Sequence, residues 1–211
     1  YKEVPGDSLP SEIKQVLDRQ IQKQIGYTPT LTVIEGEKML VDPEFLDRPE
    51  LRKVVPKAMI DWYKTDQGQW FAMELFAEME AEEVHTIYSA AQAHAKLALK
   101  YLSDHGGLIL FGTDTPSGPI YTNQPGFNGY WEMKLMYESG VPLNQILASA
   151  TINNARAFKL DSLIGSIEAG KRADMLLLTK NPLEDIMAYD NIDLVILSGQ
   201  TIERESLTTG D

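Results

Sequence analysis

The sequence contains no cysteine, no His-x-His pair and only three histidines. Without cysteine the chain forms neither disulfides nor thiolate metal sites, a composition that fits a reducing compartment. We therefore favour a cytoplasmic location. A secreted or periplasmic one stays open, because the sequence starts at Tyr1 rather than at methionine and we expect the native start to lie upstream. No apolar run approaches the length of a membrane span, so no membrane association is expected.

An excess of basic charge is also missing, because 19 Lys and Arg face 31 Asp and Glu, giving a formal net charge of -12. A broad nucleic-acid surface needs clustered basic residues, so no nucleic-acid partner is expected. What the chain does have is 43% hydrophobic residues over 211 positions. That is enough to bury a sizeable core in one or two domains.

Helical and strand-like patterns follow one another along the first 160 residues. Spacing of apolar residues, prolines and glycines defines them, with Asp7 or Ser8 as a cap for the first helix and Pro142 in the first turn of the last. The predicted elements are helix 11–25, strand 27–36, helix 51–63 interrupted at Pro56, helix 66–103 ending in "DHGG", strand 108–112, loop 115–128, and helices 128–140 and 141–158.

The composition changes after Leu160. "IGSIEAGKRADMLLL" has two strand-like runs around Gly170, and "DLVILSGQTIERE" has two more around a plausible hairpin turn at "SGQ". This order is typical of the last units of a parallel α/β barrel followed by a small β domain. We predict that strand 108–112 runs parallel to the strand near 30–34. The later strands should form a separate unit with exposed or intermolecularly paired edges.

Asp114 stands directly after the apolar run in "LILFGTDTPSG". Ligands and catalytic side chains gather at the carboxyl ends of parallel strands, which makes this carboxylate a candidate functional residue. The alternative is a residue that caps a turn or helix by accepting hydrogen bonds from nearby backbone N–H groups.

Three stretches resemble the C-terminal part of the amidohydrolase superfamily, in particular its imidazolonepropionase and prolidase-like branch. They are "GTDT", "PGFNGYWEMKLMYESGVPLNQILASATINNARAF" and "IGSIEAGKRADMLLLTKNPLEDI". "PTL" and "GTD" resemble the seventh and eighth barrel strands of that branch. The resemblance implies an α/β fold class: a partial TIM barrel of the metal-dependent hydrolase type over residues 1–160, followed by C-terminal strands of a small β-sandwich domain over 161–211.

The resemblance further implies the C-terminal fragment of a metal-dependent amidohydrolase. Such an enzyme uses metal-activated water to hydrolyse a C–N bond in a cyclic amide or dipeptide-like substrate. The cofactor implied for the full-length protein is one or two divalent ions, with zinc favoured. Asp114 matches the strand-eight acid and is the only metal-ligand position present. Its implied catalytic role is to take a proton from the attacking water and pass it to the leaving nitrogen. Phe127 is a candidate substrate contact.

The histidines depart from this family pattern, because all three precede the predicted eighth strand. His85 and His94 lie nine positions apart in a predicted helix and point to roughly opposite faces. Glu78, Glu82 and His85 share one face and could bind an ion, although a solvated charged face is the favoured interpretation. His105 is expected to contact the last carbonyls of its helix. The fragment alone is therefore predicted to be inactive and to hold no metal tightly.

Several other residues have both structural and functional interpretations. Glu132 is expected to bond loop backbone rather than to act in catalysis, and Trp131 is expected in the core. Phe127 is favoured as a contact to a pocket under the loop, with core packing as its alternative. Lys171 and Arg172 are expected to be solvated beside a turn at Gly170.

The rival to an enzyme is a non-catalytic structural or interaction module of amidohydrolase-like fold. It would only fold against another chain. For the enzyme the expected partner is a small-molecule amide or dipeptide substrate. In either case the open strand edges of an incomplete barrel invite self-association.

Overall fold

The computed structural model describes residues 8–209 of the chain. The predicted cap Asp7 lies outside the described residues, and no side chain caps the first helix. The helices are α1 Ser11–Gln22, α2 Leu31–Met39, α3 Pro49–Arg52, α4 Lys57–Tyr63, α5 Asp66–Leu75, α6 Ala81–Asp104, α7 Asn128–Glu138, α8 Leu143–Ala148 and α9 Asn154–Ala157. The strands are β1 Met175–Leu178, β2 Ile192–Leu197 and β3 Gln200–Glu203.

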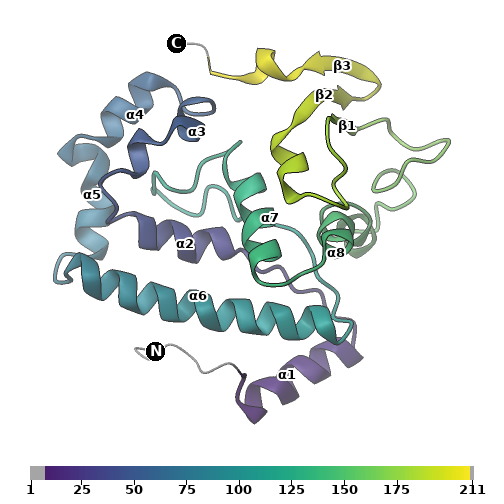
Figure 1. The fold of residues 1–211 in the computed structure, drawn as a ribbon, viewed down its shortest axis with the longest axis horizontal. Coiled ribbons are helices and arrows are strands. Elements are labelled where there is room, and N and C mark those ends of the chain that lie inside the picture. The colour runs from purple at the N-terminus through teal and green to yellow at the C-terminus, as the bar shows by residue number, and fades with distance from the viewer. Residues whose placement is uncertain (1–7, 210–211) are drawn as a thin grey trace.

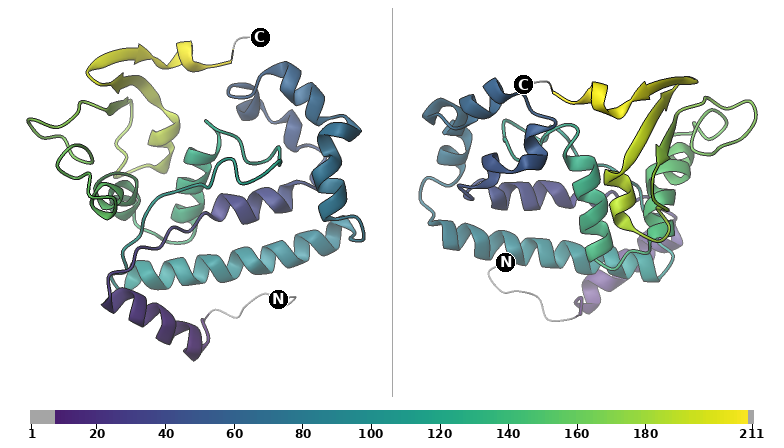
Figure 2. Two further views of the ribbon diagram at one scale, coloured as in Figure 1. Left: turned by 180° about the vertical axis from the view of Figure 1, so that it is seen from behind. Right: turned by 45° about the horizontal axis from the view of Figure 1, so that its top comes forward.

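The long helix α6 runs across the molecule and organises the other elements (Figure 1). Helix α2 packs along one side of α6, and α1 contacts it from the other. Helices α3, α4 and α5 lie toward one end. The sheet lies toward the other, and α7 stands between them in both further views (Figure 2).

Helix α6 has favourable ends. Glu82 and Glu83 in its first turn suit the positive end of the helix dipole. At the other end Gly106 adopts a φ of 77°, and the Gly107 N–H donates to the Leu102 carbonyl at 2.8 Å. These bonds close the helix in the manner predicted for "DHGG".

The single helix predicted over 66–103 is wrong, because the chain turns between α5 and α6. Phe76 is the residue directly after α5, and its side chain is buried in the same hydrophobic cluster as Val84 of α6. The turn lets α5 pack against α4 while α6 runs along α2, so tertiary packing overrides the continuous helical pattern. The break at Pro56 between α3 and α4 is confirmed.

The strand predicted over 27–36 is also wrong for its larger part. Only Tyr27 forms a β-bridge, and the chain is helical from Leu31. The Thr, Val and Ile content of this stretch favours a strand locally. A distant buried carboxylate, Glu132, accepts hydrogen bonds from the first N–H groups of α2 and stabilises the helix start instead.

The final helical run, predicted over 141–158, is confirmed with one irregularity. Helices α8 and α9 are joined without interruption by a π-helical segment, Ser149–Asn153. Pro142 is the cap residue of α8 rather than part of its first turn. The first helix stops at Gln22 rather than at 25.

Two large hydrophobic clusters fill the interior. One packs the segment between α2 and α6 against the loop that follows Asp114, with Phe45, Leu51, Ile60, Val84 and Tyr121 buried in it. The second lies under α7 and α8 and contains Leu31, Leu99, Ile109, Met136 and Ile146. The start of α2 and the segment before Asp114 are therefore anchored in one core.

The sheet is antiparallel in the order β1-β2-β3, and residues 175–203 supply all of it. The predicted hairpin at "SGQ" is confirmed, with positive φ at Ser198 and Gly199 as a type I′ turn requires. Within 164–178 only the second run forms a strand. Gly170 makes the predicted turn, but Lys171 is not solvated: its side chain is 12% exposed and pairs with Glu168 at 3.2 Å.

Within residues 8–209, no further strand pairs with the outer edge of β1 or of β3. Leu176, Leu177 and Leu197 of this sheet are about half exposed. Over the same residues, no helix has the length and apolar character that crossing a membrane requires.

Candidate functional site

Two extended segments run side by side and in parallel. The Tyr27 N–H donates to the Leu108 carbonyl, and the Leu110 N–H donates to the Tyr27 carbonyl, both at 2.9 Å. This bridge pairs Tyr27 with Ile109 in parallel. The predicted parallel direction is therefore correct, but the predicted strand 108–112 is reduced to this single bridge at Ile109, and its partner is Tyr27 rather than residues 30–34. Regular pairing stops after the bridge because α2 begins four residues later.

Glycine allows the two segments to approach closely. A Cβ atom on Gly112 would lie 2.8 Å from the Cγ2 atom of Thr28. One on Gly26 would lie 2.6 Å from the Cδ1 atom of Leu110. Larger residues at either position would push the segments apart.

Both segments end in the same conformation. Thr30 has a φ of 46° and Asp114 a φ of 51°, in the left-handed region that non-glycine residues seldom occupy. The Thr32 hydroxyl lies 3.4 Å from the Thr113 carbonyl, so the start of α2 lies beside the residue preceding Asp114. The Asp114 side chain is exposed, and no group within residues 8–209 hydrogen-bonds to its carboxylate. The capping alternative for Asp114 therefore finds no hydrogen bond in the described chain.

Glu132 of α7 lies fully buried behind these ends. Its two carboxylate oxygens accept hydrogen bonds from the N–H groups of Leu31 at 2.9 Å and Thr32 at 2.7 Å. Burial raises the pKa of this carboxyl, and the same two N–H groups oppose that rise. The predicted structural role is thus confirmed, but the bonded backbone is the first turn of α2 rather than the loop after Asp114.

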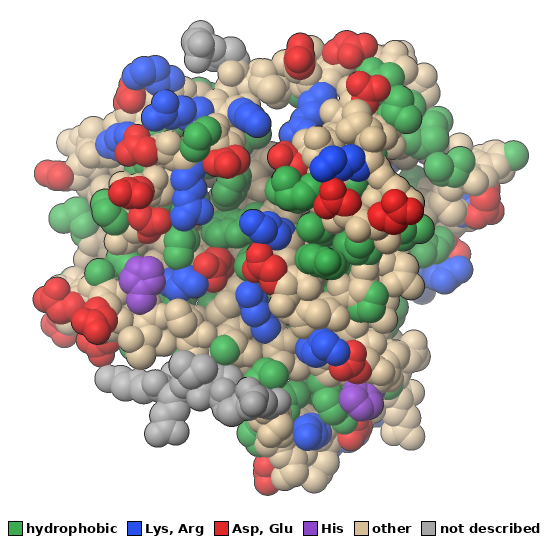
Figure 3. Space-filling model, viewed as in Figure 1, with side chains coloured by type: hydrophobic (Ala, Val, Ile, Leu, Met, Phe, Trp, Pro, Cys, Tyr) green, Lys and Arg blue, Asp and Glu red, His purple; other side chains and the backbone are tan. Residues whose placement is uncertain are grey.

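The loop from Thr115 to Phe127 is fastened to the helical part of the chain. The Tyr121 hydroxyl donates to the Leu40 carbonyl at 2.6 Å, and the Gln124 amide donates to the Tyr63 hydroxyl at 3.1 Å. The face in Figure 3 is hollowed between these helices and the sheet, and charged side chains of both signs surround the hollow.

Phe127 and Trp131 pack against core aromatics. The ring centroid of Phe45 lies 6.1 Å from that of Phe127 and 6.2 Å from that of Trp131. The expectation of core packing for Trp131 is confirmed. Phe127 is also partly buried against this core, so its role as a substrate contact remains a proposal.

The three histidines do not assemble with Asp114. His85 and His94 lie on α6, and a ring nitrogen of His94 is 2.8 Å from the Ala90 carbonyl. His105 follows α6, with a ring nitrogen 2.8 Å from the Tyr101 carbonyl, which confirms its predicted contact with the helix end. Among the described residues, no three His, Asp or Glu side chains are grouped as a metal site requires, and Glu78, Glu82 and His85 are no exception.

Two site residues were not singled out from the sequence. The side-chain amides of Asn153 and Asn154 bond the backbone of the segment that leads to Asp114. Asparagine favours hydrogen bonds to nearby backbone over a helix interior, so two of them in a helical pattern were a usable signal.

The sequence model of the Amidohydrolase family matches residues 54–202 of the chain. The chain therefore belongs to the amidohydrolase family. It is 36% identical over 162 residues to a 5-methylthioadenosine/S-adenosylhomocysteine deaminase of Caldanaerobacter subterraneus subsp. tengcongensis, covering 66% of this chain and 36% of the relative. The deaminase of the same description from Thermoanaerobacter pseudethanolicus is 30% identical over 156 residues, covering 65% and 36%. The chain thus spans about a third of the length of these curated relatives.

Solved structures show the same fold. A Xaa-Pro dipeptidase with methionine bound in its active site superposes with a TM-score of 0.57 at 24% identity, covering 90% of this chain and 37% of that one. The ochratoxinase of A. niger superposes with a TM-score of 0.56 at 21% identity, covering 90% and 34%. The fold is therefore the α/β type of the amidohydrolases, as predicted. The likeness to imidazolonepropionase in particular stays a prediction.

Proposed function

We propose that this chain is the C-terminal part of an amidohydrolase barrel that hydrolyses a C–N bond. In this proposal the segments around Tyr27 and Ile109 are barrel strands seven and eight, residues 1–160 belong to the barrel, and 161–211 belong to a composite β domain. The observation that carries the proposal is Asp114: an exposed carboxylate without an intramolecular hydrogen bond at the carboxyl end of one of two parallel segments, in a member of this family.

In this function Asp114 carries a proton. It accepts a proton from the water that attacks the substrate and delivers it to the nitrogen that leaves. An exposed carboxylate free of internal hydrogen bonds is accessible to both groups. Glu132 positions the neighbouring segment end by fixing the start of α2, and Phe127 would contact the substrate from the loop.

The described residues do not by themselves fit a catalytic metal ion. Such a site needs about three protein ligands, and the described part of the chain offers one carboxylate with no grouped partners. A divalent ion, with zinc as the first choice, would therefore take its other ligands from protein outside residues 8–209.

Two substrate classes have support. Cyclic amides and dipeptides fit the fold shared with the Xaa-Pro dipeptidase. Hydrolytic removal of an amino group from an adenine-type base is the second candidate, favoured by the 36% identity to a curated deaminase. Both reactions break a C–N bond with water, so the proton transfers proposed for Asp114 are the same.

The test uses the longest protein that the gene encodes around this chain. Xaa-Pro dipeptides, cyclic amides and S-adenosylhomocysteine are assayed with the unmodified protein and with Asp114→Asn, which keeps the shape but cannot carry the proton. We expect Asp114→Asn to lose most turnover while its circular dichroism is unchanged. Near-normal turnover in this variant would remove Asp114 from the mechanism. No turnover by the unmodified protein would favour the non-catalytic module, with self-association through the sheet edges as its testable property.

A further inference from the structure

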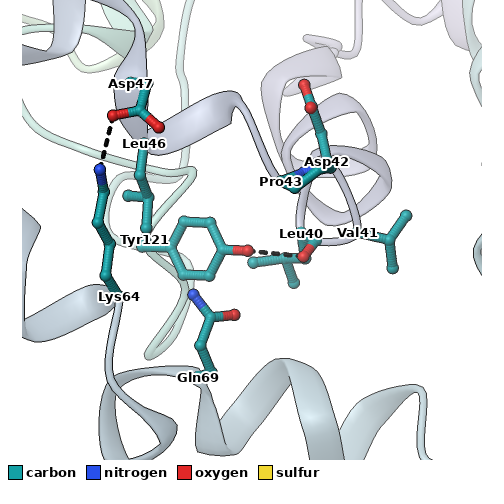
Figure 4. Close-up of a pocket in the computed structure, with 9 residues that line it drawn as sticks. All are labelled: Leu40, Val41, Asp42, Pro43, Leu46, Asp47, Lys64, Gln69 and Tyr121. Atoms are coloured by element: carbon teal, nitrogen blue, oxygen red, sulfur yellow. Dashed lines mark hydrogen bonds and ion pairs between the residues drawn. The ribbon is translucent and has the colours of Figure 1, made fainter.

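A pocket of about 410 Å³ opens on a part of the molecule that the proposed function does not use (Figure 4). It lies between the C-terminal end of α2, the 3-10 turn Phe45–Asp47, the junction of α4 and α5, and Tyr121 of the loop. Asp114 is not among the residues that line it. A volume of this size is typical of small-molecule sites.

Leu40, Leu46 and Tyr121 lie at the bottom of the pocket, whose exposed lining as a whole is more polar than apolar. Leu40 and Leu46 are each 5% exposed, and Tyr121 is 3% exposed. The Tyr121 hydroxyl is already bonded to the Leu40 carbonyl, so the ring rather than the hydroxyl is the part offered to a ligand (Figure 4). Because these three side chains are almost fully buried, they offer a ligand little apolar surface, and the polar and charged rim must supply most of the recognition.

The rim carries one positive and one negative group with spare bonding capacity. The Lys64 ammonium lies 2.6 Å from Oδ1 of Asp47, and the two side chains are 42% and 52% exposed. Oδ1 also accepts from Arg52 at 3.4 Å, whereas no group within residues 8–209 donates to Oδ2. An ammonium has three donor hydrogens, so Lys64 keeps two for a ligand.

Gln69 adds a neutral acceptor. Its Nε2 atom donates to the Tyr63 carbonyl at 2.6 Å, and no described group donates to its Oε1 atom. Asp42, by contrast, already accepts one bond at each oxygen, from the Glu44 N–H at 3.0 Å and from Arg48 at 3.1 Å. Oδ2 of Asp47 and Oε1 of Gln69 are therefore the carboxylate and amide oxygens of the pocket that accept no bond from residues 8–209, and Lys64 keeps donor hydrogens beside them.

We propose that this pocket binds a free α-amino acid. The ligand carboxylate meets the Lys64 ammonium, the ligand ammonium meets Oδ2 of Asp47, and the side chain extends past Tyr121 toward Leu40 and Gln69 (Figure 4). A zwitterion adds one ion pair to Lys64 and one to Asp47 while their own pair stays formed, which a singly charged ligand cannot do. The proposal does not depend on any role of Asp114.

An NMR titration with L-phenylalanine tests the site in the 211-residue protein. Saturable shifts are expected at Gln69 and at Tyr121. Phenethylamine lacks the carboxylate, and 3-phenylpropanoate lacks the ammonium. Each should bind about three- to fivefold more weakly, as expected for the loss of one exposed ion pair. Absence of saturable shifts with phenylalanine, or equal affinity for all three compounds, would overturn the proposal.

Two matched variants separate the site from general charge effects. Lys64→Met keeps the aliphatic stem and should weaken phenylalanine binding about three- to fivefold, whereas phenethylamine, which has no carboxylate, should bind at least as tightly as before because Asp47 is freed. Lys57→Met is the control, since Lys57 pairs with Asp61 on the same helix at 2.5 Å and does not line the pocket. It should bind phenylalanine as the unmodified protein does. Equal losses in both variants would refute the assignment of the carboxylate to Lys64.

Discussion

The side-chain amide of Asn154 pairs with the backbone of Phe111 as a neighbouring strand would. Its Oδ1 atom accepts from the Phe111 N–H at 3.1 Å, and its Nδ2 atom donates to the Phe111 carbonyl at 2.8 Å. Asn153 donates in the same way to the Ile109 carbonyl at 3.1 Å. The opposite edge of this segment is held by Tyr27, so Asp114 emerges from a backbone fixed on both sides.

Replacing Asn154 by alanine should destabilise the fold by about 1–3 kcal/mol, because two partly buried backbone groups lose their partner. The free energy of unfolding in urea measures the loss. Asn181→Ala is the control, because Asn181 is exposed and bonds only nearby backbone. It should stay within about 0.5 kcal/mol of the unmodified protein. Equal effects of the two substitutions would show that the Asn154 bonds contribute nothing specific.

Structure that depends on neighbouring residues can be predicted from this sequence, whereas structure that depends on distant residues cannot. The hairpin at Ser198 and Gly199 and the end of α6 at Gly106 depend on a few adjacent residues, and both were predicted. The local pattern favours a strand where helix α2 lies, because Glu132, which stabilises the start of α2, is about a hundred positions away in the sequence. The position of Asp114 at a segment end follows from the local apolar run. The hydrogen bonds by which Asn154 holds the preceding backbone at Phe111 do not follow from it.

Glu132→Gln should cost about 1–3 kcal/mol of folding free energy, because an amide offers only one oxygen to the two N–H groups at the start of α2. The NH₂ group of the new glutamine would face one of these two N–H donors, with which it cannot form a hydrogen bond. Circular dichroism during urea unfolding gives the value. Glu184→Gln, at an exposed glutamate, is the comparison and should be nearly silent. A silent Glu132→Gln would contradict the capping role.

The same pair of proteins has a defined pH dependence. Burial raises the pKa of Glu132 above its ordinary value of 4.5, so the folded state holds this proton more tightly than the unfolded chain. The associated stabilisation is complete below the ordinary pKa and is lost as pH rises through the raised one. Glu132→Gln does not titrate. The difference in unfolding free energy between the unmodified protein and Glu132→Gln should therefore be larger near about pH 4 than near about pH 7. A difference that grows with pH would mean that folding lowers the pKa of Glu132 rather than raising it.

Backbone conformation at Asp114 predicts which replacements the fold tolerates. Asp114 has a φ of 51°, where a β-branched side chain is disfavoured by roughly 1–2 kcal/mol. Asp114→Val should lower the thermal midpoint, whereas Asp114→Asn and Asp114→Gly should not, because asparagine and glycine adopt this conformation readily. Equal midpoints for all three variants would argue that the loop relaxes to another conformation.

The 211-residue chain alone should neither retain a catalytic zinc ion nor turn over substrate. Within residues 8–209, no second metal-binding side chain is grouped with Asp114. His94 and His105 each lie beside a backbone carbonyl of α6, and His85 lies on the same helix. About three ligands are needed to hold a catalytic zinc, and weak binding to the acidic surface is removed by a mild chelator. Zinc stoichiometry after dialysis against such a chelator, together with the hydrolysis assays above, provides the measurement. One retained zinc per chain with turnover abolished by Asp114→Asn would mean that the chain assembles a site by itself. Ligands would then have to come from a second copy or from residues outside 8–209.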